Sequence, residues 1–193
     1  MGEIGKFKTV NGNTDKGYTE KMRRNIIGME QKIRNNKDES LHIFSSKGDL
    51  LLSFQGKGNR VTTPIGTKFP ENAIWTHNHP KSLGETGIKR IGNSFSHIDI
   101  ESAVKHNAKE ARAVTPTYTF SIKRPKNGWG ATSSEVARVF KRYEKMTKSE
   151  FTDYVSKRNY SPAAVRRAEV MHFHRVNQLV AKHFGWNYTK KNK

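Results

Sequence analysis

The sequence contains no cysteine, which excludes disulfide bonds and any metal site built from thiolates. It also lacks a run of about 18 apolar residues, the length that a membrane-spanning helix needs. The first twenty residues have no apolar segment of the kind found in a signal peptide. We therefore expect a protein that stays in the cytoplasm or is carried inside a virion, without export through a signal peptide.

Acidic residues are scarce as well. The chain has 36 lysines and arginines against 17 aspartates and glutamates, a formal net charge of +19. Such an excess attracts polyanions, so nucleic acid is an expected partner. Residues 133–193 are the densest part, with 14 basic and 5 acidic side chains. The candidate contacts there are Arg138, Lys141, Arg142, Arg166, Arg167 and Arg175; the alternative is that each belongs to an ordinary solvated helix face.

Hydrophobic periodicity predicts an α+β domain. We expect helices over 18–36, from Ser96, from Thr132 and from Ser161-Pro162 to Gly185. A hairpin of two strands is expected within 40–56, turning around Lys47-Gly48-Asp49, and further strands over 60–64, 72–80 and 111–125. Three segments follow: a flexible polar leader (1–18), a metal-binding domain (19–130) and a basic helical C-terminal region (131–193). The fold class is thus α+β, with a helical C-terminal extension.

The chain contains two His-x-His pairs, and their local structure distinguishes them. Residues i and i+2 of a strand point to the same face, so His77 and His79, at the end of an expected strand, can share one metal ion. On a helix the same spacing separates two side chains by about 200°. We therefore expect His172 and His174 to be ordinary helix residues.

A carboxylate follows the first pair at a helix start. In Ser96-x-x-Asp99 we expect the serine as a helix N-cap and the aspartate in the first turn. The alternative to a metal site is that this motif is only a helix cap and that His77 and His79 are two exposed imidazoles at a strand end. Two imidazoles and one carboxylate, with a fourth position left to water, are the ligand set of a catalytic zinc site. Such a site needs a base that does not bind the metal. Glu39, just before the first core strand, is the candidate, and Asp38 is the alternative.

At these residues the chain resembles the JAB/MPN family of JAMM-motif metalloproteases. The matching residues are Glu39, His77-Asn78-His79-Pro80 and Ser96-His97-Ile98-Asp99, within a resemblance that covers about residues 38 to 125. The resemblance implies a JAB/MPN-like mixed β-sheet flanked by helices. It implies a zinc ion on His77, His79 and Asp99, with Glu39 as general acid/base. It also implies that Ser96 helps to stabilise the oxyanion formed when water attacks a peptide or isopeptide carbonyl.

The His-Asn-His-Pro and Ser-Phe-Ser-His-Ile-Asp-Ile segments look closer to prokaryotic and phage-encoded members, including JAB-type domains of phage head-morphogenesis proteins, than to eukaryotic deubiquitinases. That resemblance implies a bacterial host cell or a virion as the setting. Fifteen residues, 81–95, separate Pro80 from Ser96, which is longer than the usual family spacing. This loop is either a lid or substrate clamp, or a tolerated surface insertion.

Three functions therefore compete. The first is a zinc-dependent JAMM-type peptidase or isopeptidase acting on a protein or peptide. The second is a basic, DNA-associated structural protein, such as a minor phage-head component, whose metal site is not catalytic. The third is a metal-dependent nuclease that uses His77, His79 and Asp99 on a phosphodiester; the basic charge favours it, and the JAMM order of motifs does not.

Overall fold

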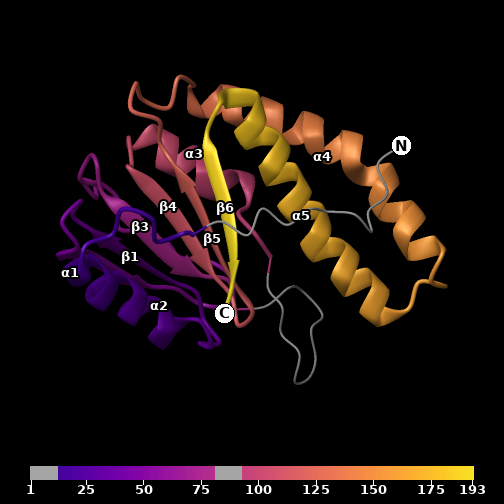
Figure 1. Cartoon of the computed structure of the whole chain (residues 1–193), viewed down its shortest axis with the longest axis horizontal. Helices are drawn as coiled ribbons and strands as arrows, with labels where there is room; N and C mark the ends of the chain where they lie inside the picture. Colours follow the sequence, from indigo (N-terminus) through magenta and orange to yellow (C-terminus); the bar gives the residue numbers. More distant parts are fainter. Residues whose placement is uncertain (1–12, 81–92) are drawn as a thin grey trace.

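A six-stranded mixed sheet forms the centre of the computed structural model, which describes residues 13–80 and 93–193 (Figure 1). Its strands are β1 (Ser40–Phe44), β2 (Leu50–Gln55), β3 (Ile74–Asn78), β4 (Glu110–Val114), β5 (Tyr118–Lys123) and β6 (Asn187–Asn192). The order across the sheet is β2-β1-β3-β4-β5-β6. Neighbours are antiparallel except β3 and β4. The chain is of the α+β class, as predicted.

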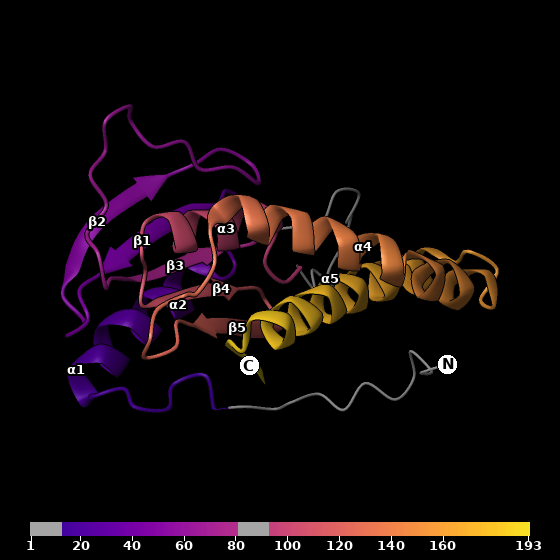
Figure 2. The ribbon, with the colours of Figure 1, turned by 90° about the horizontal axis from the view of Figure 1, so that it is seen from above.

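The helices cover both faces of this sheet. They are α1 (Glu20–Met22), η2 (Arg23–Ile27, a π-helical turn), α2 (Gly28–Ile33), α3 (His97–Lys105), α4 (Ser133–Ser156) and α5 (Pro162–Phe184). Figure 2 shows α1 and α2 on one side of the strands and α3 and α4 on the other. α3 connects the parallel strands β3 and β4, which cannot be joined by a tight turn.

The alternation of side chains along β1 and β3 explains the two layers of apolar contacts. Phe44 and Ile74 point to the α1–α2 side, where they pack with Met22 and Ile26. Ile43 and Trp75 point the other way, into the main core that α3, α4 and α5 complete. The side of the sheet that bears Trp75 is also the side of His77, two residues further along β3.

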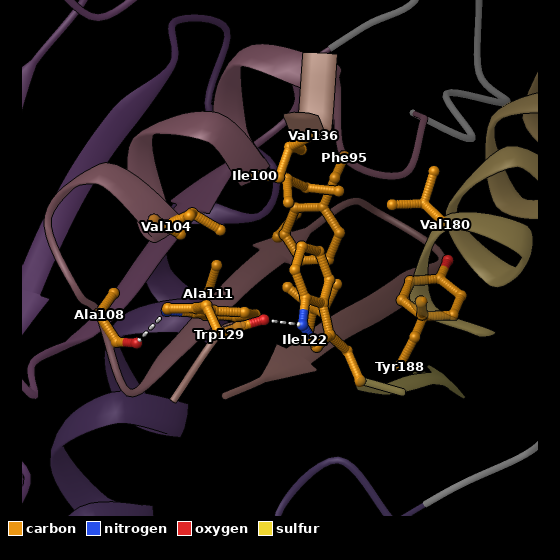
Figure 3. Packing of buried hydrophobic residues seen from close by; sticks show 14 of the residues in the cluster. Phe95, Ile100, Val104, Ala108, Ala111, Ile122, Trp129, Val136, Val180 and Tyr188 are labelled. Atoms are coloured by element: carbon orange, nitrogen blue, oxygen red, sulfur yellow. Dashed lines mark hydrogen bonds between the residues drawn. The ribbon is translucent and has the colours of Figure 1, made fainter. Parts of the chain in front are cut away.

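Two tryptophans, Trp129 and Trp186, join the C-terminal region to the main core, and Figure 3 shows the bond from Trp129 to Ala108 as a dashed line. Trp129 donates its indole N–H to the carbonyl oxygen of Ala108 at 2.9 Å, and Trp186 donates to the carbonyl oxygen of Trp129 at 2.7 Å. Their ring centroids are 4.8 Å apart at an interplanar angle of 81°. A buried indole N–H needs a partner, so these bonds fix the two loops that precede α4 and β6.

Helices α4 and α5 form a long antiparallel hairpin that extends past the sheet (Figure 2). Thr132 and Glu135 form the predicted capping box of α4. Ser161 caps α5 ahead of Pro162, and Gly185, with φ of 71°, ends it. These helix limits are confirmed because their signals are local hydrogen bonds and backbone preferences.

Of the flexible polar leader predicted over 1–18, the structure describes residues 13–18, and Thr14, Asp15 and Tyr18 are buried there. Arg112 of β4, which has no exposed surface, donates to the Thr14 carbonyl oxygen at 2.9 Å and to Asp15 Oδ1 at 3.0 Å. The Tyr18 ring lies 5.0 Å from the Arg112 guanidinium carbon. Polar residues are buried here because a buried cation requires partners.

The strand predictions need three corrections. The segment 111–125 is a hairpin of β4 and β5, turned at Thr115, whose hydroxyl accepts from the backbone N–H of Tyr118 at 2.9 Å. The expected edge strand over 60–64 is absent from the described sheet, and Arg60 makes only an isolated bridge with Lys57. Strand β6 was not predicted at all. Its polar, lysine-containing sequence gives no apolar alternation strong enough to signal a strand.

The boundary predicted at residue 130 has no counterpart in the packing. Val136, Val176 and Tyr188 from the C-terminal side are buried in the same core as Trp75 and Phe120. Strand β6 pairs with β5 over six residue pairs. The C-terminal region therefore completes the sheet and core; only the far part of the α4–α5 hairpin has a cluster of its own, around Tyr154 and Ala168.

Candidate metal centre

Strand pairing brings Glu39 to the two histidines. In the antiparallel register of β1 and β3, Leu41 lies opposite His77. Two residues further along both strands, Glu39 therefore faces His79, on the side of the sheet that carries His77. The backbone of Glu39 is held from the β2 side, since its N–H donates to the Gly58 carbonyl oxygen at 2.7 Å and its carbonyl accepts from Gly56 N–H at 2.8 Å.

The first turn of α3 supplies the second carboxylate. Ser96 is the N-cap, as predicted, and Asp99 completes a capping box with it. The backbone N–H and the hydroxyl of Ser96 both donate to Asp99 Oδ2, at 2.7 and 2.8 Å. Asp99 Oδ1 then lies nearest to His77 and Oδ2 nearest to His79, so the cap fixes the orientation of the carboxylate.

The four side chains converge on one point. Glu39, His77, His79 and Asp99 each offer a ligand atom, and these atoms all lie within 4.8 Å of one another. The Nε2 atoms of His77 and His79 are 2.8 Å apart. His77 Nε2 lies 3.5 Å from Asp99 Oδ1, and His79 Nε2 lies 3.6 Å from Asp99 Oδ2. The cluster is a site that could hold a metal ion.

The site is mostly buried, which makes its electrostatics strong. The side chains of His77, His79 and Asp99 are 7%, 16% and 18% exposed. Burial raises the pKa of Glu39 above its usual value, although the two histidines oppose this. For His79, burial lowers the pKa, but Asp99 and Glu39 outweigh it and raise the pKa to about 9. Burial would raise the pKa of Asp99, but His77 and His79 hold it well below its usual value.

The protonation pattern shows that the centre favours a cation. The Nδ1 atom of His79 lies 2.8 Å from the Asn93 carbonyl oxygen, which can only accept, so Nδ1 carries a proton. Its Nε2 atom then faces the Nε2 atom of His77. Two nitrogen lone pairs at this separation repel unless a proton or a metal cation lies with them. Metal-binding histidines commonly donate their other N–H to a carbonyl in this way.

Asn78, between the two histidines, has a structural role that the sequence did not reveal. Because it alternates with them, its side chain points to the other face of the sheet. Asn78 is fully buried, accepts from Ser40 N–H at 2.8 Å and from Ser40 Oγ at 2.9 Å, and donates to the Asp38 carbonyl oxygen at 3.0 Å. It therefore holds both neighbours of Glu39.

A second unpredicted support comes from α5 and β6. The three residues before the α3 cap each make a bond to the C-terminal part: Asn93 donates to Glu169 Oε1 at 2.9 Å, Ser94 Oγ lies 2.8 Å from Tyr188 OH, and the Phe95 carbonyl accepts from Asn177 at 2.9 Å. Because the Asn93 carbonyl orients His79, these bonds connect the C-terminal elements to the cluster. Contacts this far apart in sequence leave no local signal.

The alternatives named from sequence lie elsewhere. Asp38 accepts from the backbone N–H of Gly58 at 2.7 Å and is not part of the cluster. Both histidines of the second pair lie on α5. His172 lies 3.2 Å from the hydroxyl of Thr147, whereas His174 is buried with its Nδ1 atom 2.8 Å from Tyr188 OH. They make separate contacts, as the helical spacing predicted.

The six basic candidates are divided between two helices. Arg138, Lys141 and Arg142 are exposed on α4. Arg166, Arg167 and Arg175 lie on α5, and of these three arginines Arg167 is exposed while the other two are half-buried. None of the six belongs to the cluster of Glu39, His77, His79 and Asp99. Of the loop 81–95, which we interpreted as a lid or an insertion, residues 81–92 lie outside the described part of the chain.

Comparison of this chain with protein-family models, with curated proteins and with solved structures found no match. Within the described ranges, no helix has both the length and the apolar character needed to cross a bilayer.

Proposed function

We propose that the chain is a zinc-dependent peptidase or isopeptidase of the JAB/MPN, JAMM-motif type. The observation that carries the proposal is the convergence of Glu39, His77, His79 and Asp99, whose ligand atoms all lie within 4.8 Å. These residues occur in the order and with the types of the motif to which the sequence is similar. The phage or mobile-element setting is part of the same proposal.

The donor set fits zinc. Imidazole nitrogen and carboxylate oxygen are zinc ligands, and the chain has no thiolate to offer. Zinc bonds of about 2 Å in a tetrahedron place two ligand atoms about 3.3 Å apart. The histidine–aspartate separations of 3.5 and 3.6 Å are close to that value, and the 2.8 Å between the two Nε2 atoms is somewhat shorter. His77, His79 and Asp99 would hold the ion.

The chemistry then divides between the ion and the chain. When bound, zinc would polarise the scissile carbonyl and lower the pKa of water at the open position. Glu39 takes the proton of the attacking water and returns it to the leaving amine. Burial raises the pKa of its carboxyl, which suits a group that must both accept and release a proton. Ser96 keeps Asp99 oriented through its hydroxyl.

Metal content tests the site. Wild type purified without chelator should contain about one zinc ion per chain, and Asp99→Ala and His77→Ala/His79→Ala should contain little. The matched control is His172→Ala/His183→Ala, which also removes two imidazoles but from outside the cluster and should keep its zinc. Elemental analysis gives both the stoichiometry and the identity of the metal. Full zinc in the His77/His79 variant would contradict the proposed ligands.

Activity is tested separately. Wild type should cleave a member of a panel of peptides and lysine-linked isopeptides, and Glu39→Gln should keep its zinc but lose about 10²- to 10⁴-fold in rate, the usual contribution of a general acid/base. Plasmid and RNA incubated with zinc-, magnesium- or manganese-loaded protein form the nuclease arm. Cleavage of nucleic acid without peptide cleavage would favour the nuclease alternative; full peptidase activity in Glu39→Gln would remove Glu39 from the mechanism.

A further inference from the structure

A row of cations runs along the outer face of α4. Its five members lie at spacings of three and four residues and all are exposed: Arg138, Lys141, Arg142, Lys145 and Lys148. Positions with these spacings fall on one side of a helix. Lys145 and Lys148 were not among the sequence candidates, but the observed helix shows that they continue the same row. We call these five residues the α4 cation row.

The rest of the helix fixes the direction in which this row points. Val136, Val139 and Phe140 are buried in the main core, so the α4 cation row faces away from it. Of the large apolar side chains on α4, Met146 is the exposed one. Within residues 13–80 and 93–193, no ion pair joins any of the five cations to an acidic group.

We propose that the α4 cation row binds the phosphate backbone of duplex nucleic acid. From Arg138 to Lys148 the row is about 15 Å long at 1.5 Å per residue, and over this length one strand of a B-form duplex presents about four phosphates. The net charge of +19 adds attraction at longer range. Binding of this kind positions a protein without reading the base sequence.

Other polyanions fit this face less well. A helix that binds an anionic bilayer needs a continuous apolar side beside its cations, but the apolar side of α4 is buried in the core. Single-stranded nucleic acid is usually held by aromatic rings that stack on bases. The aromatic residues of α4 are buried or half-buried, and Tyr143 lies against His183, with ring centroids 6.1 Å apart.

The experiment distinguishes binding of DNA at the α4 cation row from non-specific attraction to the net positive charge of the chain. One variant carries glutamine at all five positions of the α4 cation row. The matched control carries glutamine at five exposed lysines on other elements: Lys32, Lys37, Lys57, Lys68 and Lys126. Both variants lose five positive charges. Affinity for a labelled 20-base-pair DNA duplex is measured by fluorescence anisotropy from about 50 to 200 mM salt, the range in which phosphate contacts are most salt-sensitive.

We expect the slope of log affinity against log salt to fall by about one unit for each contacting cation removed. The row variant should therefore lose three units or more and bind at least about tenfold more weakly at low salt, whereas the control should stay close to wild type. Equal losses in the two variants would overturn the proposal, because the binding would then follow net charge alone.

Two competitors test the class of partner. Polyglutamate and phosphatidylserine vesicles, each at the same charge concentration as the DNA, should displace the duplex poorly. Displacement by either as effective as that by unlabelled DNA would overturn the assignment to nucleic acid. Thermal melting and zinc content of both variants should match wild type, since all ten positions are exposed and lie outside the metal-binding cluster. The outcome is therefore independent of the proposed peptidase.

Discussion

Asn78, the residue between the two histidines, positions Glu39 indirectly, through the two chain neighbours of Glu39. Asn78 bonds to Ser40 and to the carbonyl oxygen of Asp38, and Glu39 lies between these two residues. A catalytic group displaced by about 1 Å can lose about 10²-fold in rate. Asn78 is therefore a positioning residue for Glu39 in the proposed reaction, while the metal ligands have supports of their own.

For Asn78→Ala we expect kcat to fall by about 10- to 100-fold while the zinc content stays at that of wild type. The free energy of unfolding should fall by about 1–3 kcal/mol, because the Ser40 N–H loses its buried partner. The control is Ser121→Ala, which removes a buried hydroxyl that donates to Glu110 Oε1 at 2.7 Å, away from the cluster. It should cost similar stability and leave kcat unchanged. Equal losses of kcat in Asn78→Ala and Ser121→Ala would show that Asn78 affects the rate only through the stability of the fold.

A buried histidine on α5 makes the stability depend on pH. Burial, with Lys190 and Arg175 nearby, lowers the pKa of His174 to about 3. Below its ordinary pKa of about 6.5 the histidine of the unfolded chain binds a proton and that of the folded chain does not. The unfolded state is therefore favoured progressively as the pH falls from about 6.5 toward 3.

Between pH 6.5 and pH 5, His174 should thus remove about 2 kcal/mol from the free energy of unfolding. His174→Asn has no such titration, so over this range it should lose about 2 kcal/mol less than wild type, whatever its starting stability. Urea unfolding with chelator present, at several pH values, measures the difference. Parallel pH profiles for the two proteins would contradict the assigned pKa.

At the scale of secondary structure, β4, α2 and the segment before α1 are joined by one buried ion cluster. Arg112 of β4 lies within 3.1 Å of carboxylate oxygens of Asp15, Glu30 and Glu110. Each of the three carboxylates is at most 6% exposed. Lys191 of β6 adds a contact to Asp15 Oδ2 at 2.9 Å. Each of the three buried carboxylates has an ion-pair partner, and Arg112 is the partner that all three share.

Replacing Arg112 by leucine should destabilise the fold by about 3–5 kcal/mol, since it leaves buried carboxylates without their partner. The exposed Arg138→Leu is the control and should change stability by less than about 0.5 kcal/mol. Urea unfolding followed by tryptophan fluorescence measures both. A loss below about 1 kcal/mol for Arg112→Leu would show that the three acids are protonated or hydrated in the fold.

The contacts of this cluster could not be predicted from the sequence, whereas the helix starts could. Ser96, Thr132 and Ser161 were correctly placed at helix starts, because a cap depends on residues three or four positions away. The burial of Asp15 depends on Arg112, which lies 97 residues further along, and nothing near Asp15 signals it. Likewise, β6 is polar, and its partner β5 begins about seventy residues earlier.

In the candidate site, too, some residues could be predicted from the sequence and others could not. The grouping of Glu39, His77, His79 and Asp99 could be expected from the resemblance, because types and order of residues are written in the sequence. Asn78 and Asn93 could not be identified, since Asn78 acts through backbone groups of a neighbouring strand and Asn93 through its own carbonyl oxygen. Hydrogen bonds to the main chain do not restrict residue type strongly enough to leave a motif.

At the scale of the whole molecule, residues 19–130 and 131–193 share one core. Val180, Trp186 and Tyr188 are buried against residues of the first part. We therefore expect a fragment of residues 19–130 to lack a cooperative unfolding transition and near-ultraviolet circular dichroism, while the full chain shows both. A fragment with a sharp transition of its own would show that residues 19–130 fold without the C-terminal region, as the boundary expected at residue 130 implies.

The two outermost strands of the sheet differ in a way that matters at high protein concentration. Strand β6 carries Lys190 and Lys191, whereas β2 has no charged residue and exposes Leu50 by 48% and Leu51 by 45%. An uncharged outer strand is a template for another chain, and a lysine there opposes such pairing. We expect self-association to join β2 to β2 and to leave β6 free. Leu51→Lys should then lower the light scattering of concentrated samples. An unchanged signal would show that self-association does not involve β2.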